Sequence, residues 1–294
     1  MILNISNKEE ASISGVVIGT EVRCSDPEFE ALGPVGWSKL LRERNKWHDL
    51  PEYLVQAAIR KGALAELSIG RRFISRHVDM APVFGQGQNR IVKRFFQDLF
   101  ARMKGSPDVD QTLAVAYFAA GTNYATATDP TDTQLVKEVF RKVPSQIYDN
   151  SLYQITVSTH LLSTEWNLPT LTVGGIYPTS TTEVYVNDAS DLSVGDAVEV
   201  VTPLGSEDCR ITNILGNIIT VYALNTENHE LPAVPEIGST VYRKLAEWGS
   251  FMGGAATSSP NTGALMNRKL ELYTKTNTAG VLVDNIFSFQ PSGT

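Results

Sequence analysis

The stretch that decides the fold runs from Leu113 to Arg141 and reads LAVAYFAAGTNYATATDPTDTQLVKEVFR. Its first part, Leu113–Phe118, is a near-continuous apolar run of the length that is typical of a buried β-strand. A polar loop rich in Thr, Ala and Asn follows, from Gly121 to Pro130. The last part predicts a short turn or helix that begins with Asp132 as its N-cap. We interpret this stretch as the core of a β-domain to which the remaining segments are attached.

Further strands are predicted after this core. Tyr153–Leu161 alternates between apolar and polar residues, as a half-exposed strand does, and Leu171–Tyr177 is its predicted partner. Residues 248–263 are rich in Gly, Ser and Thr and predict a flexible connector. Beyond the connector, Ala264–Tyr273 and Gly280–Phe289 predict two strands that return to the β-domain and close it.

The N-terminal part has a different pattern. Ile13–Val22 is β-like but is broken by two glycines, which favours an arm or an edge strand. Residues 26–80 place apolar residues at i, i+3 and i+4 and predict helices. From Asn89 to Met103 a wide apolar stripe lies opposite a basic face, which predicts an amphipathic helix that packs on the β-domain.

Residues 181–244 change character again, because short strand-like runs alternate with turn signals. The segment is acidic and predicts a small barrel or sandwich inserted into the β-domain. Its predicted strands are Thr182–Val186, Ala197–Val201, Arg210–Ile214, Ile218–Tyr222 and Thr240–Arg243.

The sequence therefore predicts an α+β fold that is mainly β. Residues 1–84 form an N-terminal arm and a helical docking region in this interpretation. Residues 85–180 together with 245–294 form an antiparallel β-sandwich with one packing helix, and residues 181–244 form the inserted acidic β-barrel-like module.

Charge and composition exclude some classes of protein. The chain of 294 residues has a net charge of -7, and the residues after 110 carry 18 Asp and Glu against 9 Lys and Arg, which argues against a nucleic-acid surface there. No apolar run approaches the length of about 18 residues that a membrane helix needs. The N-terminus lacks the apolar region of a secretory signal, so we expect a soluble, uncleaved protein. Cys24 and Cys209 have no metal-binding spacing and are expected to be reduced.

Catalytic motifs are missing from the sequence. It contains no nucleophile elbow, no phosphate-binding loop and no HExxH zinc motif. The four histidines share no spacing, and the acidic residues of the loops are expected to cap turns rather than to bind calcium. We therefore predict no catalytic, cofactor-binding or metal-binding residue, no cofactor and no enzymatic activity. The residues considered are His48, His77, His160, His229, Asp129, Asp132, Glu138, Asp188, Asp191 and Asp196.

One succession of motifs runs through the β-domain: a helix, an A-x-G-T strand end, a D-T-x-L-x-x-E-x-x-R segment and a strand pair that ends in x-G-[IL]-[YF]. This pattern resembles a domain of virion proteins of tailed bacteriophages, found in tail-fibre, tail-tip and baseplate-associated proteins. The segments ALMNRKLELYTKT and VLVDNIFSF are similar to the closing strands of that domain. The matching residues are Gly121, Thr122, Asp132, Thr133, Leu135, Glu138, Arg141, Gly175, Ile176 and Tyr177.

The resemblance implies a non-enzymatic structural component of a phage particle, as a tail-fibre, baseplate or tail-tip connector protein. Such a protein is made in the host cytoplasm, resides in the virion, binds other virion proteins and forms a homotrimer or homohexamer, without a nucleic-acid or membrane partner. Residues 1–80 would dock on the particle and the acidic module would project outward. Glu138 and Arg141 at i and i+3 would form a bracing pair.

Three alternatives stay open at this point. The protein could decorate the neck or the capsid, or it could be an enzyme such as a glycan depolymerase. It could also bind a host-receptor carbohydrate through an exposed aromatic groove, although burial of aromatic side chains in the core is the usual outcome. The aromatic residues considered for that groove are Trp166, Tyr185, Tyr222, Trp248 and Tyr273.

Overall fold

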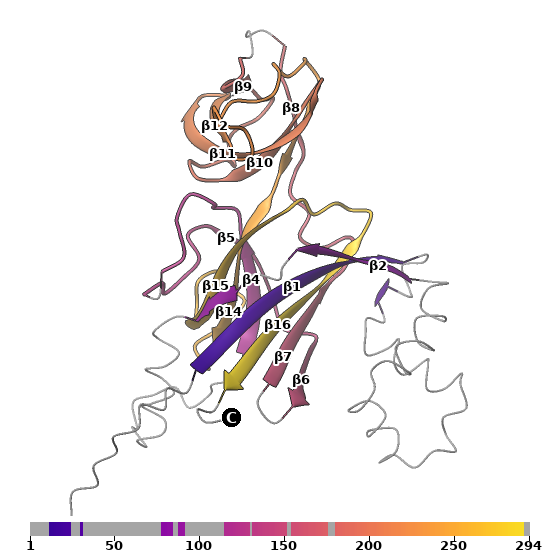
Figure 1. Ribbon diagram of the computed structural model, residues 1–294, viewed down its shortest axis with the longest axis vertical. Helices are drawn as coiled ribbons and strands as arrows, with labels where there is room; N and C mark the ends of the chain where they lie inside the picture. The colour runs from indigo at the N-terminus through magenta and orange to yellow at the C-terminus, as the bar shows by residue number, and fades with distance from the viewer. Residues whose placement is uncertain are drawn as a thin grey trace, which may run out of the picture.

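A computed structural model describes residues 12–24, 30–31, 78–84, 88–91, 115–129, 131–151, 154–175 and 180–290 of the chain. The strands formed by these residues all belong to two antiparallel sheets, a large one below and a small one above in Figure 1. The fold is therefore mainly β, as the sequence predicts. None of the described residues forms a long apolar helix of the kind that crosses a bilayer.

The large sheet has ten strands in the order β5-β4-β14-β15-β3-β1-β16-β7-β6, and β2 also pairs with β1. Its N-terminal and central strands are β1 (Ser12–Cys24), β2 (Val78–Phe84), β3 (Gln88–Ile91), β4 (Val115–Gly121), β5 (Glu138–Lys142), β6 (Gln146–Ser151) and β7 (Gln154–Leu161). Its C-terminal strands are β14 (Leu245–Met252), β15 (Ala264–Tyr273) and β16 (Gly280–Gln290).

The two ends of this large sheet share one core, and a smaller apolar cluster of Ala119, Leu135, Phe251 and Leu265 is separate from it. β5 and β6 lie at opposite ends of the strand order, yet only residues 143–145 separate them along the chain. The two ends of the sheet must therefore approach each other. Both halves contribute apolar side chains to one cluster, in which Trp166 stacks on Phe118 and on Phe140. The buried members are Val17, Phe118, Ala120, Leu161, Trp166, Leu245, Trp248, Tyr273, Val281 and Val283.

The small sheet has six strands in the order β8-β13-β10-β11-β12-β9. Alternate residues of its strands point into a core of their own, as in β12, where Ile219, Val221 and Ala223 are buried. The predicted strands of residues 181–244 are confirmed. Their bounds are β9 (Glu183–Tyr185), β10 (Ala197–Thr202), β11 (Gly205–Leu215), β12 (Ile218–Ala223) and β13 (Thr240–Arg243).

One strand of the small sheet comes from outside the segment 181–244. β8 (Leu171–Thr172) pairs with β13, and Val173 forms a bridge with Val186. The prediction that Leu171–Tyr177 pairs with Tyr153–Leu161 is therefore wrong. β7 pairs with β16 and β6 instead, because β16 offers it a long complementary edge in the large sheet.

The helical predictions fail at the two strands that test them. Residues 78–80 belong to β2, and residues 89–91 of the predicted packing helix belong to β3. β3 bonds to β15 on one side and to β1 on the other, so tertiary strand pairing overrides the local helical period. Residues 32–77 and 92–103 of the helical predictions lie outside the described residues, and only residues 30–31 are helical.

Two further predictions are corrected by the large sheet. β1 is a strand, but it is not an arm or an edge, because it lies between β3 and β16 and pairs with β16 along most of its length. Residues 248–252 are not a connector, because they belong to the fully buried strand β14. Gly249 is required there, since a Cβ atom would lie 2.9 Å from the carbonyl oxygen of Asn267 on β15.

The predicted closing strands are confirmed in position. β15 and β16 both belong to the large sheet, where β3 and β1 separate them, so they do not form a hairpin with each other. The predicted turn or helix after Asp132 is a turn up to Lys137, followed by β5. The chain is extended there because β5 pairs with β4 at the end of the sheet.

Candidate functional site

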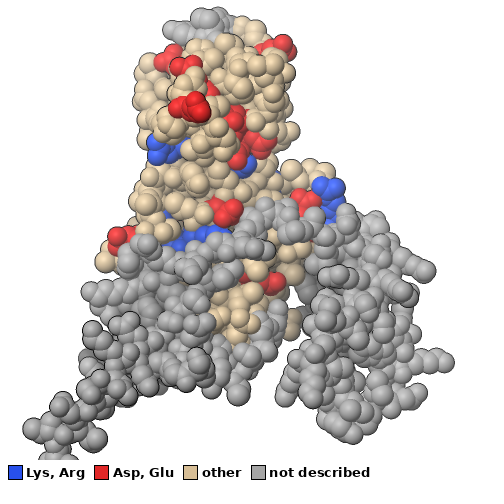
Figure 2. Space-filling model, viewed as in Figure 1, with Lys and Arg blue, Asp and Glu red and all other residues tan. Residues whose placement is uncertain are grey.

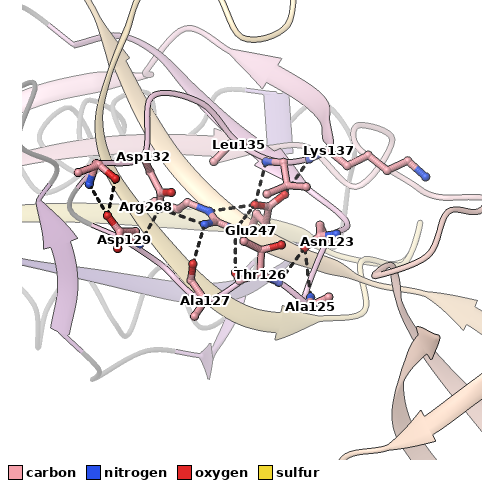
Figure 3. Close-up of polar contacts among 12 residues, drawn as sticks. Asn123, Ala125, Thr126, Ala127, Asp129, Asp132, Leu135, Lys137, Glu247 and Arg268 are labelled. Atoms are coloured by element: carbon pink, nitrogen blue, oxygen red, sulfur yellow. Dashed lines mark hydrogen bonds and ion pairs between the residues drawn. The ribbon is translucent and has the colours of Figure 1, made fainter.

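The most concentrated polar chemistry among the described residues is a buried ionic cluster, which we call the latch: Asp132, Glu247 and Arg268 (Figure 3). Arg268 on β15 is fully buried. Its Nε and Nη2 donate to Glu247 Oε1 at 2.9 and 2.5 Å, and its Nη1 donates to Asp132 Oδ2 at 3.0 Å. Two further bonds reach the carbonyl oxygens of Thr126 and Ala127 at 3.0 and 3.2 Å. All five donors of the guanidinium are thereby used.

Glu247 on β14 is the counter-charge of the latch and is also fully buried. Its two carboxylate oxygens accept hydrogen bonds from the backbone N–H groups of Val136 and Lys137, both at 3.0 Å. A buried ion pair is tolerated only when such additional bonds satisfy its remaining lone pairs. The latch therefore ties the chain between Thr126 and Lys137 to the two central strands β14 and β15.

Gly121 and Thr122 adjoin the latch and explain one of the sequence motifs. A Cβ atom at position 121 would lie 2.8 Å from Glu247 Oε2 and would also collide with the carbonyl oxygen of Lys137, so only glycine fits. The N–H group of Thr122 donates to the same carbonyl oxygen at 3.1 Å. The glycine–threonine pair thus lets the chain approach the latch closely.

Glu138 and Arg141 form a second buried pair next to the latch. Arg141 Nε and Nη2 donate to the Glu138 carboxylate at 2.6 and 2.9 Å, and both side chains are almost fully buried. Arg141 Nη1 also donates to the carbonyl oxygens of Thr257 and Thr262, both at 2.9 Å, and the guanidinium lies 4.2 Å from the centre of the Phe251 ring. The predicted bracing pair is confirmed, and it fixes the loop between β14 and β15.

A third set of contacts, which we call the joint, connects the two sheets. Asp196 at the start of β10 is buried, and its carboxylate accepts from Lys137 Nζ at 2.6 Å, from the Thr122 hydroxyl at 2.8 Å and from the Ser193 N–H at 2.9 Å. Backbone bonds run beside it, from Ala197 N to Thr122 O at 2.9 Å. The small sheet is thus fixed to the same loop that the latch holds.

Most of the residues that carry the family resemblance meet at these contacts. Asp132 belongs to the latch, and Gly121 adjoins it. Glu138 and Arg141 form the second buried pair, and Thr122 belongs to the joint. Leu135 is fully buried beside them, and its N–H donates to Asn261 Oδ1 at 3.2 Å. Gly175 lies elsewhere, close to Ile237 of the small sheet, and residues 176–177 lie outside the described residues.

The role predicted for Asp132 is wrong, because no helix follows it. Its carboxylate instead accepts the N–H of Asp129 at 2.8 Å and binds Arg268. Sequence reasoning missed Arg268, Glu247 and Lys137 altogether. A signal existed for Glu247, since it is a charged residue between apolar residues, and a buried charge needs a partner.

The remaining acidic candidates behave as ordinary turn residues. The Asp188 carboxylate accepts the N–H of Ser190 at 2.9 Å, as an Asx-turn does, and this bond lowers the pKa of Asp188. Asp191 Oδ2 lies 3.8 Å from Arg243 Nη1 and forms an ion pair with it. Within the described part of the chain, no three His, Cys, Asp or Glu side chains are grouped so that they could hold a metal ion.

Three of the five aromatic candidates for a carbohydrate groove are buried, and the other two, Tyr185 and Tyr222, are half-buried. Trp166, Trp248 and Tyr273 are buried, as expected for core aromatics, and Trp248 Nε1 donates to the carbonyl oxygen of Glu271 at 2.7 Å. Tyr222 is half-buried, and it contacts both Arg210, 4.7 Å from its ring centre, and the stacked ring of His229. These contacts occupy the surface on which a sugar ring would stack.

Cys209 has no nucleophilic character. It is a free, buried thiol in the core of the small sheet. Burial, followed by the charges of Glu207 and Asp208, raises its pKa to about 12, so the thiol stays protonated at neutral pH.

Comparisons with protein-family models, with curated proteins and with solved structures found no match for this chain.

Proposed function

We propose that this protein is a non-enzymatic structural component of a tailed-phage particle, most simply a tail-fibre, baseplate or tail-tip connector. In this proposal the large sheet is the β-sandwich body of the component. The small acidic sheet is an accessory module that the body holds away from the particle. The docking region is supplied by the N-terminal residues up to 84 other than β1 and β2, which belong to the large sheet.

One observation carries the proposal. Most of the residues that carry the resemblance to phage virion proteins lie at neighbouring buried contacts, in which Arg268 and the Glu138–Arg141 pair tie loops to strands. The charged groups of the latch are bonded to one another or to backbone. Such an arrangement favours mechanical bracing over binding a substrate, and a particle component needs rigidity under load.

The joint supports the same proposal. It fixes the small sheet to the large one through the buried Asp196 carboxylate and through backbone bonds, so the module cannot swing freely. On the face seen in Figure 2, acidic side chains gather over the small sheet and Lys and Arg side chains lie at its base. A rigid acidic projection suits a connector that meets a basic neighbouring surface.

The proposal is tested on purified particles of the phage that carries this gene. Mass spectrometry should find the polypeptide at a fixed stoichiometry, and antibodies raised against the small sheet should label the tail in electron micrographs. Light scattering on the isolated chain should give a trimer or hexamer, in line with the symmetry of tail components. Absence of the chain from purified particles would overturn the proposal, and labelling of the head or neck would move its position.

A further inference from the structure

A second buried carboxylate lies among the described residues, away from the latch. Glu30, in the short helical pair Glu30–Ala31 that follows β1, is only 7% exposed. Its carboxylate accepts two hydrogen bonds from Ser163, one from the backbone N–H to Oε1 and one from the hydroxyl to Oε2 at 2.6 Å. Ser163 follows the end of β7. The contact therefore joins two parts of the chain that are distant in sequence.

The surroundings of this carboxylate form a built site, which we call the socket: Ser163, Lys275 and Gly280. A Cβ atom at Gly280 would lie 2.7 Å from Glu30 Oε1 and 2.7 Å from the carbonyl oxygen of Leu161. A side chain at position 280 would therefore push the carboxylate out. The glycine at the start of β16 keeps the space that Glu30 occupies.

Lys275 holds the walls of the socket in place. Its buried ammonium donates to the carbonyl oxygens of Ser163 at 3.1 Å and of Ala279 at 2.8 Å, which flank the space from two sides. Further bonds reach the carbonyl oxygen of Thr276 at 2.7 Å and Asn167 Oδ1 at 3.2 Å. These bonds of Lys275 tie the socket to the loops of the large sheet.

Charge compensation favours a carboxylate in this socket. Burial lowers the pKa of Lys275 to about 8, while the carboxylates of Glu30, Glu165 and Glu21 act in the opposite direction. Removing the Glu30 carboxylate would leave Lys275 with less compensation in a desolvated place. The two groups therefore stabilise each other across the site.

We propose that the socket is the anchor that fastens the chain between β1 and β2 to the large sheet, with Glu30 as the group that it holds. Strand pairing fixes β1 up to Cys24 and β2 from Val78 onward. Between these strands the described residues are Glu30 and Ala31, and the Glu30 carboxylate is what joins them to the β7 and β16 ends of the sheet. This inference concerns the chain itself and holds whether or not the protein belongs to a phage particle.

Hydrogen exchange on the full-length chain tests the anchor. In a Glu30→Gln variant the Ser163 N–H loses a charge-assisted bond, so its exchange should accelerate about tenfold or more. The neighbouring Leu162 N–H donates to Glu165 Oε2 at 2.8 Å and serves as an internal reference that should not change. Limited trypsin digestion should at the same time cut faster between residues 32 and 77, where Lys39 and Arg72 lie.

A second variant closes the socket while keeping both bonding partners. Gly280→Ala should accelerate Ser163 exchange and trypsin cleavage as Glu30→Gln does, and Glu227→Gln, at an exposed position of the small sheet, should change neither. Protected amides in β14 report that the large sheet of each variant is folded, and if Gly280→Ala fails to fold, Glu30→Gln alone decides. Unchanged Ser163 exchange in Glu30→Gln would overturn the contact. Faster exchange without faster cleavage would overturn its role as an anchor.

Discussion

The two sheets bury their interiors in different ways. The small sheet packs a core of aliphatic side chains and Cys209, and β10, β11 and β12, which are neighbours in sequence, contribute seven of its fifteen buried side chains. The large sheet combines aromatic and aliphatic side chains with fully buried charges, Arg268 and Glu247, and pairs the ends of the described chain, as in Ser12 with Gln290. A local apolar core can be recognised in a sequence, whereas a core that depends on distant ionic partners cannot.

The largest loss of stability is expected at the latch, whose buried charges distinguish the large sheet from the small one. Replacement Arg268→Met leaves the Glu247 carboxylate buried without its cation and should lower the free energy of unfolding by about 4 kcal/mol. Urea denaturation followed by tryptophan fluorescence measures the loss, because Trp248 lies in the core of the large sheet. The double variant Arg268→Met/Glu247→Gln should recover part of the loss by removing the unpaired charge. A single-variant loss below about 1 kcal/mol would contradict the bracing role of the latch.

The stability of the small sheet should depend on the volume of its buried side chains and not on buried charge. Ile211→Ala, at a fully buried position of β11, should cost about 3 kcal/mol, and Ile211→Val about 1 kcal/mol, as cavity formation in an apolar core predicts. Hydrogen exchange should show lost protection in β10 to β12, with β1 and β16 retaining theirs. Equal loss of protection in both sheets would mean that the joint makes them one cooperative unit.

The joint should be weaker than either core. Lys137 is partly exposed, and after Lys137→Met the buried Asp196 carboxylate keeps its bonds from Thr122 and Ser193, so we expect a loss of about 1 kcal/mol or less. The matched control is Arg23→Met, which removes a more exposed pair with Glu21 and should cost still less. Thermal denaturation of both variants measures the difference, and a larger loss in the control would contradict the joint.

The smallest expected effect is a pH dependence that arises from His160 in the large sheet. Burial lowers the pKa of His160 below its ordinary value of 6.5, and Lys142 and Lys275 add to that, although Glu30 and Glu165 oppose it. The unfolded chain therefore binds more protons than the folded chain as the pH falls through 6.5, and stability is lost in that direction. A separate window lies below about pH 4.5. The bonds from Lys142 and Leu162 lower the pKa of Glu165 despite its burial, so its contribution to stability is lost as the pH falls through this range.

Melting temperatures measured between pH 7 and pH 5 isolate the histidine from the carboxylates. The wild type should lose stability over this range, and His160→Gln should lose less of it. An identical pH dependence in the wild type and in His160→Gln would contradict the assignment.

Much of the candidate site was outside the reach of sequence reasoning. The Glu138–Arg141 pair was predictable because its members are three residues apart and meet through local geometry. The partners of Arg268 are distant, with Asp132 separated by 136 positions, and no local period indicates such a contact. Strand pairing had the same difficulty, since β3 and β1 lie between β15 and β16 although neither is near them in the chain.

The sequence by itself determined the β class, the strands of the small sheet and the position of the closing strands, because alternation of apolar residues and turn chemistry act over a few residues. The tertiary structure alone decided that residues 89–91 are extended, that β1 is central and that Glu247 and Arg268 form an ion pair. The physical reason is that backbone pairing and charge compensation are satisfied by whatever partner the fold brings close. Local propensity, worth some tenths of a kcal/mol per residue, yields to them.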